Sequence, residues 1–400
     1  MLWASLRLAP SCLGALFLIA LGASGLGCSS TDADPPSPGP TSGTGGTGGT
    51  GGTGGSGGTG GTGGVGGSGG SGGAGGSVID PALVVQYDFP AGDTLAPENG
   101  WSFASTDWPL APLPDGSGVG LPFTYGADLA GEDSTREMRF TMPAADEFWL
   151  RLRWHVPANY HHRQDLRLDI LDAASLGWQI GDVVRGVDGT SEGTISRVTG
   201  DNVFLRDAAK SYHDSVWIGA VTNVTRSNSL TSTDRAREPA NNKLLAIWTD
   251  DYSAHGVGPT IVWQTDLLDD NNEASVLTVG YSTGNYTVTG SVVNGGVLIA
   301  SADRGKYMDI VFHGKFATAA GAKDGVIRSW VRKQGESDYT QFHDITDADM
   351  NKPESLPAPE QLWQRGYLMG WSNSGFDGET TFHLSKIEYY DARPAALGAP

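Results

Sequence analysis

The stretch Phe148-Trp149-Leu150-Arg151-Leu152-Arg153-Trp154-His155-Val156 decides the fold class, because apolar and polar side chains alternate along it. Successive side chains of a β-strand point to opposite faces. One face of this strand would carry Phe148, Leu150, Leu152 and Trp154, and the other Trp149, Arg151, Arg153 and His155. The pattern predicts a strand with one face in a core.

The same alternation recurs outward along the chain, over residues 135–142, 166–170 and 307–316. Gly, Asn and Asp stand at the breaks between these segments, and convincing helical periodicity is absent. An all-β sandwich is therefore predicted for residues 78–177 and 225–400.

A different pattern lies between them, at residues 178–224. Very short apolar pieces such as Val183-Val184 and Val203-Phe204-Leu205 are separated by glycines. We predict a small inserted β-barrel similar to SH3-like barrels; an elaborate loop of the main domain is the alternative.

The chain begins with Arg7, an apolar core over residues 13–21 and small residues before Cys28. This layout resembles a bacterial lipoprotein signal, in which the cysteine carries the lipid. Residues 29–77 are rich in Gly, Thr, Ser and Pro and are expected to form a disordered tether. Residues 1–28 are thus predicted to be a signal peptide, and the protein to be secreted and lipid-anchored at the bacterial cell surface or outer membrane through Cys28. Secretory cleavage nearby, without lipid, is the alternative.

The net charge of the chain limits which partners it can bind, and the positions of its cysteines show whether it can form disulfides. The chain has a formal net charge of −19, and no tract clusters Lys and Arg as phosphate contacts require, so a nucleic-acid partner is excluded. Both cysteines, Cys12 and Cys28, lie in the leader, so the folded part has no disulfide. We expect it to act as a monomer.

Three passages resemble concanavalin A-like jelly rolls, including laminin-G-type modules and polysaccharide lyases. They are residues 307–332, with Asp324-Gly325 as a turn before Trp330, residues 367–391, and residues 148–163. The resemblance implies a two-sheet sandwich whose concave sheet holds an extended sugar chain. No cofactor is required for this role, and the resemblance allows one structural calcium ion, whose ligands the sequence does not identify.

Cationic and aromatic side chains on the outward faces suggest what such a groove would bind. We predict that Arg139, Arg151, Arg153, Trp149 and Trp330 bind an extracellular, anionic polysaccharide, because guanidinium groups pair with carboxylate or sulfate. These arginines could equally form cross-strand charge pairs with Glu137, Asp165, Asp169 and Asp309.

A lyase that cleaves a uronic-acid polymer by β-elimination is the second hypothesis. That reaction needs a base such as His or Tyr, and His155, Tyr160, His161 and His313 are the candidates. The compact motifs of alginate lyases are missing, and Arg136-Glu137 is the nearest similarity. A structural or adhesive surface protein is the third hypothesis.

Overall fold

The structure of the protein is a computed structural model. It describes residues 80–89, 95–126, 134–161, 165–206, 208, 214–237, 241–249, 258–267, 274–282, 293–358, 360–373, 375–376 and 378–398. The predicted signal peptide, Cys28 and the tether lie outside these residues. Within the described ranges, no helix is long and apolar enough to cross a membrane.

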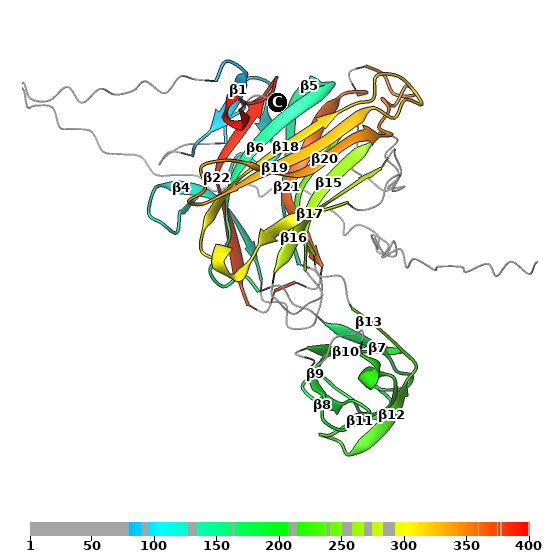
Figure 1. Cartoon of the computed structure of the whole chain (residues 1–400). Coiled ribbons are helices and arrows are strands. Elements are labelled where there is room, and N and C mark those ends of the chain that lie inside the picture. The colour runs from blue at the N-terminus through cyan, green and yellow to red at the C-terminus, as the bar shows by residue number, and fades with distance from the viewer. Residues whose placement is uncertain are drawn as a thin grey trace, which may run out of the picture. The chain divides into compact units, whose positions relative to one another are not determined.

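The first sheet of the sandwich has the strand order β20-β19-β18-β6-β22-β4-β3, and β1 pairs with β22 (Figure 1). All its pairs are antiparallel. Its strands are β1 (Leu83–Tyr87), β3 (Ala111–Pro112), β4 (Val119–Tyr125), β6 (Glu147–His155), β18 (Tyr307–Lys315), β19 (Gly325–Lys333), β20 (Thr340–Ala348) and β22 (Thr380–Tyr390).

The second sheet has the order β17-β16-β15-β14-β21-β5-β2 and is also antiparallel. Its strands are β2 (Ser102–Phe103), β5 (Ser134–Ala145), β14 (Asn241–Trp248), β15 (Thr260–Leu267), β16 (Ser275–Ser282), β17 (Val293–Ile299) and β21 (Trp363–Asn373). The chain changes sheet repeatedly, as in β4, β5 and β6, which gives a jelly-roll sandwich. The predicted fold class is confirmed.

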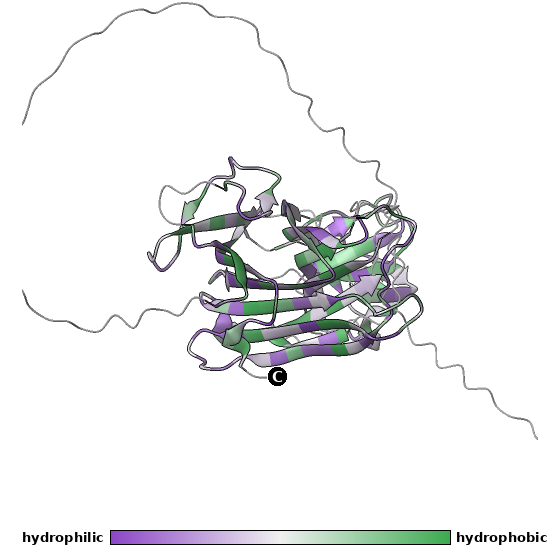
Figure 2. Ribbon diagram, turned by 90° about the horizontal axis from the view of Figure 1, so that it is seen from above, coloured by the Kyte–Doolittle hydropathy of each residue, from purple (hydrophilic) through white to green (hydrophobic). Residues whose placement is uncertain are grey.

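One core lies between the two sheets. Phe148, Leu150, Leu152 and Trp154 of β6 contribute to it from the first sheet, as the alternation predicted, and Met138 and Phe140 of β5 from the second. Hydrophobic and hydrophilic residues alternate along the strands in Figure 2. Burial of this apolar surface is the main stabilising contribution to the fold.

His343 of β20 connects the two sheets at the edge of the sandwich. Its Nε2 donates to the carbonyl oxygen of Val293 on β17 at 3.1 Å, and its Nδ1 lies 2.7 Å from Oγ of Ser329 on β19. A Cβ at Gly295 would lie 3.0 Å from the imidazole, so glycine lets β17 approach this side chain.

A third antiparallel sheet forms a small separate unit with the order β12-β11-β8-β9-β10-β7-β13. Its elements are β7 (Leu166–Asp169), β8 (Val183–Arg185), β9 (Glu192–Val198), β10 (Asn202–Arg206), the 3₁₀ turn η1 (Ser215–Trp217), β11 (Gly219–Asn223), β12 (Asn228–Ser232) and β13 (Asp234–Arg237). The two end strands, β12 and β13, are joined through Thr233 alone, so the sheet curls around its own core into a barrel.

The barrel is wider than the predicted 178–224. Residues 166–170 had been assigned to the sandwich, but β7 pairs with β10 and β13, and Leu166, Leu168 and Ile170 pack with Trp178 and Trp217 in the barrel core. Alternation identifies a buried face but not the core to which that face belongs, which explains the difference.

Candidate functional site

The structure divides the predicted cationic set between the two sheets. Arg139 lies on β5 in the second sheet, whereas Arg151, Arg153 and His155 lie on β6 in the first. The prediction that one trough gathers all of them is therefore wrong. Arg139 forms an exposed ion pair with Glu137, with Nε and Oε1 2.8 Å apart.

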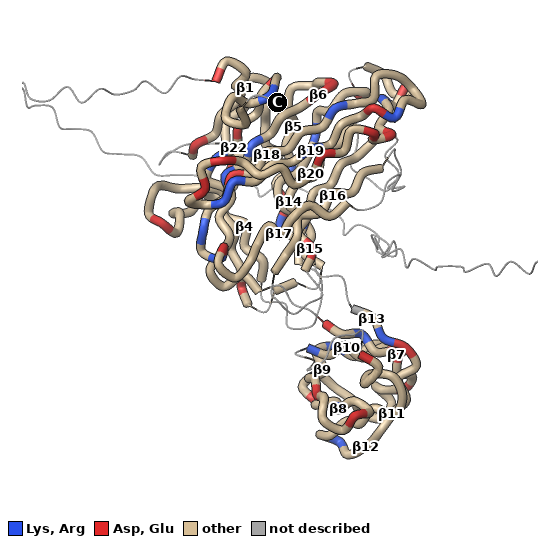
Figure 3. Tube along the Cα trace, viewed as in Figure 1, with Lys and Arg blue, Asp and Glu red and all other residues tan. Residues whose placement is uncertain are grey.

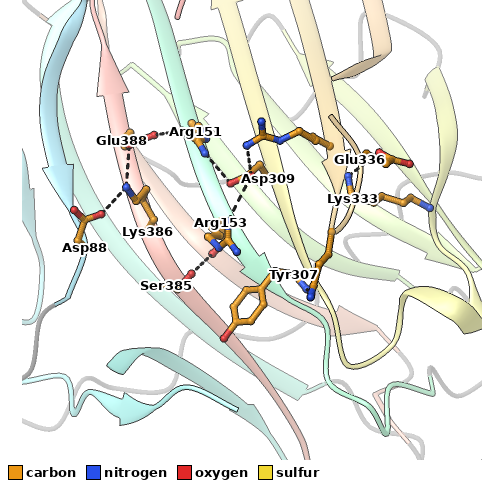
Figure 4. A network of polar contacts seen from close by, with 12 residues as sticks. Asp88, Arg151, Arg153, Tyr307, Asp309, Lys333, Glu336, Ser385, Lys386 and Glu388 are labelled. Atoms are coloured by element: carbon orange, nitrogen blue, oxygen red, sulfur yellow. Dashed lines mark hydrogen bonds and ion pairs between the residues drawn. The ribbon is translucent and has the colours of Figure 1, made fainter. Parts of the chain in front are cut away.

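The arginines of β6 belong to a network of opposite charges on the outer face of the first sheet (Figure 4). Arg151 lies 3.0 Å from Asp309 and 2.8 Å from Glu388, and Asp309 also accepts from Arg332 at 2.7 Å. Arg153 is 3.7 Å from the same carboxylate. Acidic segments accompany the basic ones around β22 and β18 in Figure 3.

The arginines of this network already have carboxylate partners. Burial works against the charged form of Arg151, but the carboxylates of Asp309 and Glu388 outweigh it and raise the pKa of Arg151. Arg151 and Arg153, two of the side chains that were predicted to bind an anion, thus have carboxylate partners within the protein. This outcome matches the alternative of cross-strand charge pairs.

The predicted tryptophans on this face are packed against each other. The rings of Trp149 and His313 stack with centres 3.7 Å apart, and Trp149 and Trp330 stack at 5.5 Å. Both indoles are buried, with Leu83 and Leu397 packed against them, and the guanidinium of Arg393 lies over both. The two indoles therefore stabilise the fold and are not presented to a ligand.

The four predicted bases are not brought together. His313 is buried and lies 2.9 Å from Oε1 of Glu147, and burial lowers its pKa. The hydroxyl of Tyr160 lies inside the core, 2.8 Å from Oγ of Ser275, and burial raises its pKa. His161 is half-buried and adjoins residues 162–164, which are outside the described ranges. His155 faces Tyr307 and His383 on the outer side of the first sheet.

A different polar cluster occupies the outer face of the second sheet. The Lys243 ammonium donates to Oδ1 of Asn241 at 2.9 Å and to Oε1 of Gln264 at 2.6 Å. The Gln264 amide in turn donates to Oδ2 of Asp266 at 2.9 Å, and the Thr278 hydroxyl donates to the same carboxylate. The register places Lys243, Gln264 and Thr278 opposite one another on β14, β15 and β16.

These hydrogen bonds orient donors and acceptors across three strands. Gln264 and Thr278 are buried, whereas Lys243 and Asp266 are half-buried. Ile261 and Trp263, the alternate residues of β15, lie in the sandwich core, so the polar set points to the outer side.

Aromatic side chains lie on the same side. Tyr367 of β21 packs with Ala246 and Trp248 in a cluster separate from the core. Trp371 is 47 % exposed, and its neighbour Ser372 is fully buried opposite Asn242, so alternation directs Trp371 outward. We call the group formed by Asn241, Lys243, Gln264, Asp266, Thr278, Tyr367 and Trp371 the Lys243 face. Trp371 is its exposed member and Lys243 and Asp266 are half-buried, whereas the other four are buried.

Gly370 allows the aromatic and cationic parts of the Lys243 face to meet. A Cβ at this position would lie 2.7 Å from Cε2 of Tyr367 and 3.0 Å from Cβ of Lys243. The backbone of Gly370 is also held by Tyr125, whose hydroxyl donates to its carbonyl at 2.9 Å. Arg139 lies opposite Tyr367 in the register, so this one predicted residue does adjoin the Lys243 face.

Two polar residues in apolar strands could have indicated this face from the sequence, but the prediction was based on the arginines instead. Gln264 and Thr278 interrupt strongly apolar strands, Thr260–Leu267 and Ser275–Ser282, at positions where a solvent-facing residue is expected. Their convergence with Lys243 depends on a β-bulge between Lys243 and Leu245, which changes the side of the following residues. Sequence alternation does not reveal such a bulge.

Among the described residues, no group of three or more His, Cys, Asp or Glu side chains is arranged to hold a metal ion. Asp349 and Asn351, which have the alternate spacing of a calcium loop, bond to each other, with the Asn351 amide donating to Asp349 at 2.7 Å.

Comparison with known proteins gives structural similarity alone. No protein-family model and no curated protein sequence matches the chain. A PL-14 alginate lyase from Aplysia kurodai is 10% identical, with a TM-score of 0.35, over 72% of this chain and 88% of that one. Alginate lyase vAL-1 from a Chlorella virus is 7% identical, with a TM-score of 0.35, over 75% and 99%. Winged bean acidic lectin, in complex with methyl-alpha-D-galactose, is 9% identical, with a TM-score of 0.34, over 76% and 96%. Identities and TM-scores this low assign neither a family nor an activity.

Proposed function

We propose that this protein binds an extracellular polysaccharide on the Lys243 face. The observation that carries the proposal is the exposed indole of Trp371 beside a hydrogen-bonded row of donors and acceptors. An indole offers a flat apolar surface for a sugar ring, and a few oriented polar groups select hydroxyl and carboxylate positions. Single exposed apolar residues are common on proteins; Trp371 differs from them because oriented donors and acceptors of the Lys243 face lie beside it.

The charge of this face favours an anionic glycan. Lys243, Arg139 and Arg365 lie on its side of the second sheet against Glu137 and Asp266, while the chain as a whole has a formal net charge of −19. An acidic polymer repelled by the rest of the surface would find its favourable contacts here. Attachment through Cys28 and a cell-surface location belong to the same proposal.

A lyase is the second candidate, because the face includes the types of residue that β-elimination uses. Tyr367 supplies a phenol, whose ring is buried beside Trp248, and Gln264 and Lys243 supply groups that could neutralise a uronate carboxylate. In this alternative, His155, Tyr160 and His313 have no role, since the two histidines lie on the first sheet and the tyrosine lies in the core; His161 stays a candidate base.

The test measures binding of the full chain to alginate, polygalacturonate, chondroitin sulfate and neutral dextran by calorimetry. Trp371→Ala should weaken binding of the preferred acidic polymer about tenfold or more, and Trp371→Phe, which keeps a ring, should retain most of the affinity. Leu171→Ala, a change of an exposed apolar residue in the barrel, is the matched control. Binding that Trp371→Ala leaves unchanged would refute the proposal.

Absorbance at about 235 nm, where an unsaturated uronate absorbs, separates the two candidates. A rise that Tyr367→Phe abolishes, without loss of binding, would establish the lyase. A flat trace with saturable binding would establish the binding protein.

A further inference from the structure

Two histidines lie opposite each other on neighbouring strands of the first sheet, away from the Lys243 face. His155 is the last residue of β6, and its register partner on β22 is His383. The adjacent pair, Trp154 and Leu384, fills the sandwich core. Since side chains alternate along a strand, both imidazoles are directed to the outer side of the sheet.

Both imidazoles are buried and incompletely satisfied. His155 is 4 % exposed and His383 is 8 % exposed, and Nδ1 of each ring has no hydrogen-bond partner. A buried polar atom that loses its contact with water and gains no partner destabilises the folded state. Two such atoms on facing residues call for a shared partner.

The geometry points to a transition-metal ion as that partner: we propose that His155 and His383 together bind one divalent ion of the Zn²⁺ or Cu²⁺ class, with water completing its coordination. The ring centres lie 6.0 Å apart with an interplanar angle of 70°. Two imidazoles that each place a nitrogen about 2 Å from one ion have ring centres roughly 5–6 Å apart. Imidazole nitrogen suits Zn²⁺ and Cu²⁺ and does not suit Ca²⁺ or Mg²⁺.

The surroundings keep the ligands in the form that a metal requires. Burial lowers the pKa of both histidines, and for His383 the neighbouring His155 lowers it further, which favours the unprotonated imidazole. Tyr307, the other register neighbour of His155, donates from its hydroxyl to Oδ1 of Asp115 at 3.2 Å. The carboxylate of Asp115 contributes negative charge near the two histidines. The positive charge of Arg153, whose guanidinium lies over the Tyr307 ring, is countered by Asp309 at 3.7 Å.

The experiment titrates the tag-free full chain with ZnSO₄ and with CuSO₄ by calorimetry. One ion should bind per chain, and His155→Phe and His383→Phe, which keep a ring but remove its nitrogens, should each weaken binding about tenfold or more. His313→Phe is the matched control, because His313 is a buried histidine of the same face engaged with Glu147. Its binding should equal that of the unchanged chain.

A second measurement keeps the test decisive if a variant fails to fold. In the unchanged chain, imidazole carbon–proton NMR signals of two histidines should shift on addition of Zn²⁺, and Cu²⁺ should give an electron paramagnetic resonance spectrum with coupling to two nitrogens. The proposal would be overturned if neither ion bound at a hundredfold molar excess over about 10 µM protein. It would also be overturned if folded His383→Phe bound the ion as tightly as the unchanged chain. Glycan binding is unaffected by either result, because the two sites lie on different sheets.

Discussion

The ammonium of Lys243 lies 2.6 Å from Oε1 of Gln264, across the pair formed by β14 and β15. Because the amide oxygen accepts this bond, the amide nitrogen points to Asp266, where it donates at 2.9 Å. One neutral side chain thus connects a cation with an anion on the Lys243 face.

Gln264→Leu should remove both hydrogen bonds while conserving size. Glycan affinity is expected to fall about tenfold, and the free energy of unfolding by roughly 1–3 kcal/mol, because buried polar groups lose partners. Calorimetry and urea denaturation measure the two effects. Gln341→Leu, on β20 of the first sheet, is the control, and equal affinities of the two variants would contradict the role of Gln264.

Asp309 is expected to be the most sensitive residue of the charge network. It is buried and lies within 4.0 Å of Arg151, Arg153 and Arg332. Asp309→Asn should lower the free energy of unfolding by about 3–5 kcal/mol, since the guanidiniums would repel one another without their shared anion. Glu137→Gln, which breaks an exposed pair, should cost less than about 1 kcal/mol. Similar urea midpoints for the two variants would show that the network contributes little.

Gly366 should tolerate no side chain. A Cβ there would lie 2.5 Å from the carbonyl oxygen of Ala246 and 2.5 Å from Cζ of Phe140. Gly366→Ala is expected to destabilise the sandwich by about 2 kcal/mol or more, because β21 must shift between β14 and β5. Gly126→Ala, which meets nothing within 4 Å, should leave the melting temperature nearly unchanged. A stable Gly366→Ala variant would contradict the packing described for β21.

Acid should weaken the contact between the two sheets at His343. Burial lowers the pKa of His343 to about 4 from an ordinary value of 6.5. Between these values the unfolded chain binds a proton that the folded chain excludes, so stability is lost as the pH falls from about 6.5 towards 4. The loss from this residue is of the order of 3 kcal/mol.

Urea denaturation from pH 8 to pH 4 measures this dependence. His343→Gln should flatten the decline in part, because the buried His155, His313 and His383 also have lowered pKa values and continue to contribute. An unchanged slope in His343→Gln would exclude His343 as a source of the acid sensitivity.

The barrel should fold without the sandwich. It has a core of its own around Trp178 and Trp217, and Arg226 pairs with the buried Asp182 at 2.6 Å. A fragment of residues 165–238 is expected to give dispersed amide NMR signals and one cooperative thermal transition. Trp217→Ala should abolish both. A disordered fragment would show that the barrel depends on its host.

The fold class was predictable because β6 and β5 alternate cleanly. Pairing between strands was not, since it depends on contacts distant in sequence. β5 ends at Ala145 and β6 begins at Glu147, yet the two strands belong to different sheets. Arg139 and Arg151 are therefore separated although they are close in the chain.

The candidate site was less predictable than the fold. The charge of Arg151 suggested a ligand, but its partners Asp309 and Glu388 come from β18 and β22, far along the sequence. Cross-strand pairs with Glu137, Asp165, Asp169 and Asp309 were the alternative that the sequence offered. Arg151 of β6 does pair with Asp309 of β18, whereas Arg139 and Glu137 pair within β5. Lys243 and Gln264 come together through a bulge, which leaves no trace in the alternation.

The register of the barrel has a consequence for its history. Arg237, where the chain leaves the barrel, is the paired partner of Leu166, where it enters. Such partners have Cα atoms only about 5 Å apart, so the host sequence must bridge no more space than a hairpin would. A module with termini this close can be inserted into the sandwich, removed from it or replaced without displacing the strands on either side. Another small domain with adjacent termini could therefore be inserted at the same position.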